Sequence, residues 1–226
     1  MFPLYDSTPR RSFPFINYLL IAINVYVFFV QLSSPDPDAF IFQNGFIPSR
    51  FSLSDLSTYE YILRSMFLHG GFLHILSNMW FLHIFGDNVE DVMGHLPYLI
   101  FYLVGGIVAT FAQYIIAPGL TVPLIGASGA ISAVAGAYYV LFRHSRVVSI
   151  VTIFIFWQIV RLPVWIFLGY WFILQLFSGI GSIGSFDMNQ GGVAWFAHIG
   201  GFIFGVLVAN LLYGQKKTEY DPEYEE

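Results

Sequence analysis

The chain has 226 residues, of which 57% are hydrophobic and 10% charged, whereas an average soluble domain has about 25% charged residues. A soluble globule of this size could not hide so much apolar surface, and a disordered chain would be far more polar. The net charge of −5 and the nine Lys and Arg residues argue against nucleic acid as a partner. The absence of cysteine excludes disulfides and thiol chemistry. We therefore expect an integral membrane protein.

Apolar stretches predict six membrane-spanning helices, since a bilayer requires about 20 mostly apolar residues. The predicted spans are 13–32, 65–86, 96–116, 127–142, 161–178 and 194–213. Proline and glycine in 117–123 separate the third span from the fourth, because both residues stop helices. The apolar segment 147–160 is too short for a span, and we interpret it as an interfacial or re-entrant piece. The expected fold is an all-α, polytopic membrane protein with a six-helix bundle.

Basic residues near the span ends predict the orientation in the membrane, because cytoplasmic loops are enriched in Lys and Arg. An N-terminus inside the cell places most of them on the cytoplasmic side: Arg10, Arg11, Arg143, Arg146, Lys216 and Lys217. The expected organisation is a short cytoplasmic N-terminus (1–12), a membrane domain (13–213) and a polar cytoplasmic tail (214–226).

Polar residues inside spans are costly, so each is a functional hypothesis. The first is Ser128, which lies between glycines at the outer start of the fourth span. Its hydroxyl could be exposed on a tight turn, and its own N–H at a helix N-terminus could face an anion. Small residues recur every four positions at Ser128, Ser132 and Gly136, which is also typical of closely packed membrane helices. The segment thus predicts packing as well as chemistry.

A second polar residue, His198, lies in the sixth span on the same face as Gly201 and Gly205, which form a G-x-x-x-G pattern. If this face packs against the small-residue face that contains Gly129, the two helix backbones approach closely. His198 could then reach Ser128 and, as a neutral imidazole, take the proton of the serine hydroxyl.

The second span supplies His74 and Asn78, four residues apart on one helix face. Each carries an N–H donor, and convergence with the Ser128 N–H would make an oxyanion hole. Asn78 could instead form an ordinary interhelical hydrogen bond. The nearest acid to the fourth and sixth spans is Asp187, in a loop, so we expect a Ser-His dyad rather than a full triad.

Three motifs together resemble the rhomboid intramembrane serine proteases. They are H-G-G-F-L-H-I-L-S-N-M at 69–79, G-A-S-G-A at 126–130 and A-H-I-G-G-F-I-F-G at 197–205. They occur in the family's order, on the second, fourth and sixth of six spans. The resemblance covers about 61–213, which is nearly the whole predicted membrane part.

The resemblance implies a role for each candidate residue. Ser128 would be the nucleophile and His198 the base, while His74, Asn78 and the Ser128 N–H would stabilise the oxyanion. Some family members carry a tyrosine four residues after the serine, stacked on the histidine. This chain has Ser132 there, so other groups must hold the base.

The family implies endoproteolysis of single-pass transmembrane proteins near the outer membrane face, with no cofactor and no metal. The partners would be these substrates and the lipid bilayer, and the location a prokaryotic inner membrane with both termini cytoplasmic. Several glycines make the segment 178–193 suitable as a mobile lid, with the fifth span as a lateral gate.

Three alternatives remain open. A catalytically silent relative could bind membrane clients, although such proteins usually lose the serine or the histidine. A haem-binding electron carrier could use His74, His83 and His198, and a transporter could hold a midplane site.

Overall fold

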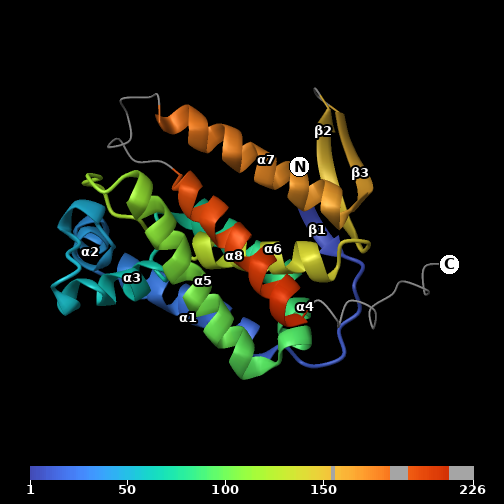
Figure 1. Cartoon of the computed structure of the whole chain (residues 1–226), viewed down its shortest axis with the longest axis horizontal. Coiled ribbons are helices and arrows are strands. Elements are labelled where there is room, and N and C mark those ends of the chain that lie inside the picture. Colours follow the sequence, from blue (N-terminus) through green and yellow to red (C-terminus); the bar gives the residue numbers. More distant parts are fainter. Residues whose placement is uncertain (154–155, 184–192, 214–226) are drawn as a thin grey trace.

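A computed structural model describes residues 1–153, 156–183 and 193–213 of the chain. Its elements, in chain order, are the following: β1 (Phe2–Asp6), α1 (Phe15–Leu32), α2 (Pro37–Asn44), the 3₁₀ turns η1 (Pro48–Arg50) and η2 (Leu56–Thr58), α3 (Glu60–Ser65), α4 (Phe72–Met93), α5 (His95–Ile116), α6 (Ser128–Leu141), β2 (Arg146–Ile153), β3 (Phe156–Pro163), α7 (Val164–Ile183) and α8 (Trp195–Tyr213). The fold is mostly helical, which confirms the predicted class (Figure 1).

Among the described residues, four helices are long and apolar enough to cross a membrane: Phe15–Leu32, His95–Ile116, Val164–Ser182 and Trp195–Tyr213. The other two predicted spans correspond to α4, which ends in a charged turn, and to α6, which has only 14 residues. Helix α6 contacts α4, α5, α7 and α8 and is buried along almost its whole length. Because protein surrounds it, α6 does not have to match the thickness of the lipid.

The second predicted span, 65–86, is wrong at both ends. Residue 65 ends α3, and α4 begins only at Phe72 and continues to Met93, beyond the acidic residues that seemed to terminate it. The carboxylate of Glu90 explains this extension, because it is buried and accepts the backbone N–H groups of Ile16 (2.9 Å) and Asn17 (2.7 Å). A carboxylate at the first turn of α1 satisfies N–H groups that have no partner within the helix.

The segment 147–160, predicted as an interfacial or re-entrant piece, forms β-structure instead. Strands β2 and β3 pair antiparallel, with Val148 opposite Arg161, and β1 pairs antiparallel with β2, with Phe2 opposite Ile150. The sheet order is β1-β2-β3, and the sheet stands beside the start of α7 (Figure 1). A β-branched run favours strands once a partner strand is available.

Strand β1 is held to the helices by polar contacts. The Trp80 indole N–H donates to the carbonyl of Pro3 (2.7 Å). The partly buried carboxylate of Asp6 accepts hydrogen bonds from the Tyr138 hydroxyl (2.5 Å) and from the Asn88 side-chain amide (2.9 Å). The N-terminal segment is thus part of the folded protein.

The fifth helix also differs from its predicted bounds, 161–178. It begins at Val164, because the preceding residues belong to β3, and it continues to Ile183. Gly179 and Gly181, expected in a lid, therefore lie in α7. The remaining lid glycines at 184, 191 and 192, and also Asp187, lie outside the described residues.

Helices α6 and α8 pack with their backbones in contact. A Cβ atom added to Gly201 would collide with the backbone oxygen of Gly129, and one added to Gly205 would collide with backbone atoms of Ala133 and Ala137. Only glycine permits so close an approach. The three glycines expected at helix-packing positions therefore lie at this interface.

Candidate active site

Ser128 is the first residue of α6 and follows a turn that requires glycine. Gly126 has φ +115°, a backbone conformation that L-residues with side chains rarely adopt. Its N–H donates to the carbonyl of Ser65 (2.9 Å), and an added Cβ would lie 2.8 Å from Nε2 of His74. In the described residues the N-cap position of α6, Ala127, makes no side-chain cap hydrogen bond. The first N–H groups of a helix have no partner within the helix and are suited to bind an anion.

His198 lies in the first turn of α8 and faces Ser128. The distance between His198 Nε2 and Ser128 Oγ is 2.8 Å, within hydrogen-bonding range. The backbone contact between α6 and α8 creates this proximity, because Gly201 lies one turn after His198 and against Gly129. The two residues expected to form a dyad are therefore brought together.

Helix α7 holds the other side of the imidazole. Nδ1 of His198 lies 2.8 Å from Oε1 of Gln175. The ring of Trp171 lies near the imidazole in a tilted arrangement, with a centroid distance of 6.0 Å and an interplanar angle of 33°. Trp195 approaches edge-on at 6.2 Å. Ser132, at the position of the family's stacking tyrosine, donates to the backbone oxygen of Ser128 instead (2.6 Å).

The sequence predicts that groups other than residue 132 hold His198, but Gln175 is not among the predicted site residues. The signal was available: Gln175 is a polar residue in a predicted span, and such residues are functional candidates. Trp171 lies four residues earlier in the chain, so both side chains share a face of α7.

Asn78 lines the same cavity as Ser128 and His198. This cavity of about 180 Å³ is lined by the following residues: Ser77, Asn78, Phe81, Ser128, Ile131, Ser132, Ala135, Trp171 and His198. The side-chain amide nitrogen of Asn78 is buried and has no hydrogen-bond partner in the described part of the chain. An unpaired buried donor is costly, so this N–H group is available to a substrate oxygen in the cavity.

His74 lies next to the Gly126 turn and does not line this cavity. Its Nδ1 accepts the N–H of Gly70 (3.3 Å). In a neutral imidazole Nε2 then carries the proton, and this nitrogen is the one that faces Gly126. The structure thus places one predicted oxyanion donor, Asn78, in the cavity and the other, His74, against the turn that leads to Ser128.

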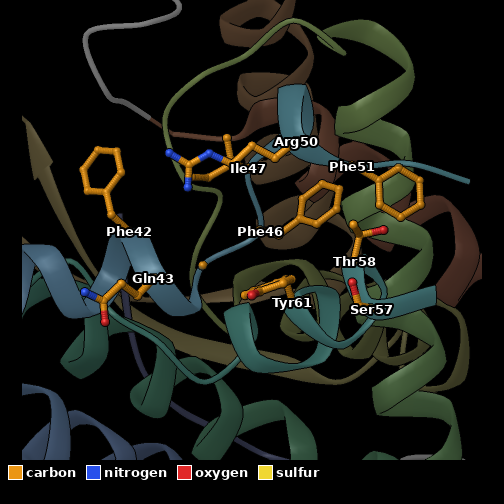
Figure 2. Close-up of a pocket in the computed structure, with 10 residues that line it drawn as sticks. Phe42, Gln43, Phe46, Ile47, Arg50, Phe51, Ser57, Thr58 and Tyr61 are labelled. Atoms are coloured by element: carbon orange, nitrogen blue, oxygen red, sulfur yellow. The ribbon is translucent and has the colours of Figure 1, made fainter. Parts of the chain in front are cut away.

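A second cavity, of about 270 Å³, is lined by residues of the segment 42–61, which includes the end of α2, η1, η2, the start of α3 and the loops between them. Figure 2 shows four aromatic side chains around it, those of Phe42, Phe46, Phe51 and Tyr61, together with Arg50. Its lining residues include no histidine and no carboxylate, so it offers no base to activate a hydroxyl.

The comparisons with known proteins agree with the fold and the motifs. The model of the Rhomboid domain matches residues 56–215. The mouse (Mus musculus) "Presenilin-associated rhomboid-like protein, mitochondrial" is 27% identical over 64% of this chain and 36% of its own length. "Putative rhomboid protease YdcA" from Bacillus subtilis is 33% identical over 38% of this chain and 44% of its own. "Rhomboid-like protein 11, chloroplastic" from Arabidopsis thaliana is 31% identical over 40% of this chain and 32% of its own.

In each of these three comparisons the chain spans less than half the length of the curated relative it matches. The family model, in contrast, covers most of this chain, from the turn before α3 to the end of α8. Together with the apolar helices, this match makes the chain an integral membrane protein. The protein belongs to the rhomboid family.

Proposed function

We propose that the protein is an intramembrane serine endopeptidase that cleaves single-pass transmembrane proteins near the outer membrane face. The observation that carries this proposal is the distance of 2.8 Å between Ser128 Oγ and His198 Nε2. A serine hydroxyl paired with an imidazole is the basic unit of nucleophilic catalysis by serine. The pair lies beside a cavity that contains an unpaired donor on Asn78.

The proposed reaction uses these groups in sequence. Ser128 Oγ attacks the substrate carbonyl carbon while His198 Nε2 takes the hydroxyl proton. The carbonyl oxygen becomes an oxyanion, which the Asn78 amide and the Ser128 N–H stabilise, with His74 as the third proposed donor. The C–N bond then breaks as His198 returns its proton to the leaving amine. Water hydrolyses the acyl-enzyme by the same steps and regenerates the serine.

The position of the site supports the proposed substrate class. Ser128 and His198 begin α6 and α8, and Asn78 lies in the second turn of α4, so the site is at one end of the bundle. Peptide bonds inside a helix are protected by their own hydrogen bonds, so we expect cleavage where Gly, Ala or Pro weakens the substrate helix. With the proposed orientation, both termini are cytoplasmic and the site faces the outer side of a prokaryotic inner membrane.

A fluorophosphonate probe tests the proposal on detergent-purified protein. We expect wild-type protein to be labelled covalently, and Ser128→Ala and His198→Ala to lose labelling. Ser77→Ala is the matched control, because Ser77 lines the same cavity but its hydroxyl donates to the carbonyl of His74 (2.9 Å). This variant should be labelled like the wild type.

Cleavage of a model transmembrane substrate in liposomes completes the test. Loss of cleavage in Ser128→Ala and His198→Ala, with cleavage by the wild type, would support the protease. Folded wild-type protein that is neither labelled nor able to cleave would overturn the proposal and favour a client-binding relative.

A further inference from the structure

We propose that Gln175 is a positioning residue that fixes the tautomer and the orientation of His198. The inference rests on the proposed function, because it assigns His198 the role of base. The inference concerns a hydrogen bond between helices α7 and α8. This hydrogen bond can be measured whether or not the protein cleaves a substrate.

The two ring nitrogens of His198 have different partners. Nδ1 faces Oε1 of Gln175 and Nε2 faces Oγ of Ser128, each at 2.8 Å. An amide oxygen only accepts hydrogen bonds, and a neutral imidazole has one donor and one acceptor nitrogen. Gln175 therefore keeps the proton on Nδ1, which leaves the lone pair of Nε2 directed at Ser128. This is the tautomer that a general base requires.

The orientation of the ring is fixed by the same helix. Trp171 and Gln175 lie one turn apart on α7. The Trp171 ring lies 6.0 Å from the imidazole, centroid to centroid, and Oε1 of Gln175 lies 2.8 Å from Nδ1. The Gln175 side chain is held in place by burial, since only 7% of the residue is exposed. Helix α7 thus supplies the support that the residue at position 132 does not give.

A neutral amide suits this position. A carboxylate without a charged partner is costly to bury, whereas an amide that is hydrogen-bonded is not. The amide stabilises an imidazolium less than a carboxylate would. We therefore expect its removal to cost less than the roughly 10⁴-fold loss seen when the aspartate of a serine-protease triad becomes asparagine.

The test compares Gln175→Leu, which removes the acceptor, with Gln175→Glu, which keeps an oxygen acceptor in nearly the same place. Gln113→Leu is the matched control. Gln113 is also 7% exposed, and its Oε1 accepts the N–H of Phe196 at the start of α8 (3.1 Å) without touching the imidazole. The control therefore removes a buried glutamine contact to the same helix.

The first readout is nitrogen NMR of histidine-labelled protein, with the His198 signal assigned by its loss in His198→Ala. Wild-type protein should show the Nδ1–H tautomer, and Gln175→Leu should show a shift toward Nε2–H. The tautomer should be unchanged in Gln113→Leu. If Gln175 had only a structural role, Gln175→Leu and Gln113→Leu would both lower the stability of the protein. The tautomer of His198 would then not change in Gln175→Leu alone.

The second readout is the kinetics of substrate cleavage. Gln175→Leu should lower kcat by about 10- to 100-fold with little change in KM. Gln175→Glu should recover part of that loss, because it restores an oxygen acceptor but a carboxyl group is costlier to bury than an amide. An unchanged tautomer in Gln175→Leu, or an unchanged kcat, would overturn the proposal. If the wild type cleaves nothing, the proposed function fails, and the NMR comparison alone decides whether Gln175 positions His198.

Discussion

The closest backbone approach in the bundle makes Gly205→Ala a demanding test of how the site is assembled. A Cβ at position 205 would lie 2.8 Å from the carbonyl carbon of Ala133 and 2.9 Å from the N of Ala137, and it would be closer still to the Ala133 oxygen. These are backbone atoms of α6, so no side-chain rotation relieves the overlap. Ordinary contact begins at 3.4 Å, so α8 must move away from α6 by at least about 0.6 Å.

The displacement acts on the dyad because His198 lies on α8 seven residues before Gly205, about 10 Å along the helix. Movement of this size brings the 2.8 Å contact between His198 and Ser128 to the limit of a hydrogen bond. A misplacement of about 1 Å can cost about 100-fold in rate. We therefore expect kcat/KM for a transmembrane substrate in liposomes to fall by about 10- to 100-fold in Gly205→Ala.

Gly181→Ala is the matched control for this substitution. Gly181 is also helical, but an added Cβ there meets no atom within 4 Å. Thermal unfolding in detergent separates a rate effect from loss of fold, since overpacking costs about 1–3 kcal/mol. If folded Gly205→Ala cleaves the substrate at the wild-type rate, the reasoning that backbone contact sets the dyad geometry is refuted.

Two further predictions follow from single polar groups. Asn78→Ala should lower kcat by about 10²- to 10³-fold with little effect on stability, because it removes a proposed oxyanion donor. Unchanged cleavage by the folded variant would exclude that role. Burial raises the pKa of the Asp6 carboxyl above its ordinary value of 3.8. Because the folded state binds this proton more tightly than the unfolded state, stability falls as the pH rises from 3.8 through the raised pKa. Asp6→Asn should lose this part of the pH dependence of thermal unfolding, and an identical pH profile would contradict it.

The catalytic candidates could be predicted because polar groups are rare exceptions in apolar spans. Ser128, His198 and Asn78 were singled out by the cost of burying them in a membrane, and the structure places all three around one cavity. Small residues along 128–136 and at 201 and 205 indicated which helices meet. Both signals are local in sequence, so each could be found without knowing the fold.

The sheet could not be predicted from local sequence patterns, because its strands come from distant parts of the chain. The apolar run at 147–160 suits a strand and a membrane segment equally well, and periodicity alone does not separate them. The deciding partner is β1, which pairs Phe2 with Ile150 from the opposite end of the chain. Likewise, the charge of Glu90 indicates the end of a membrane span when only the sequence is considered. In the structure its carboxylate accepts hydrogen bonds from backbone N–H groups in the first turn of α1. The helix can therefore continue past it.

The distribution of polar groups gives a physical reason for the proposed dyad supported by an amide. The partly buried carboxylate of Asp6 and the buried carboxylate of Glu90 lie at the end of the bundle opposite the cavity, and both accept several hydrogen bonds. Around the cavity, the described polar side chains are hydroxyls, amides and imidazoles. Neutral groups cost less to bury than ions and still orient one another by hydrogen bonds. If the proposed catalysis is correct, it depends on how closely α6, α7 and α8 pack, because in the described part of the chain the partners of the His198 ring nitrogens are the neutral Gln175 and Ser128.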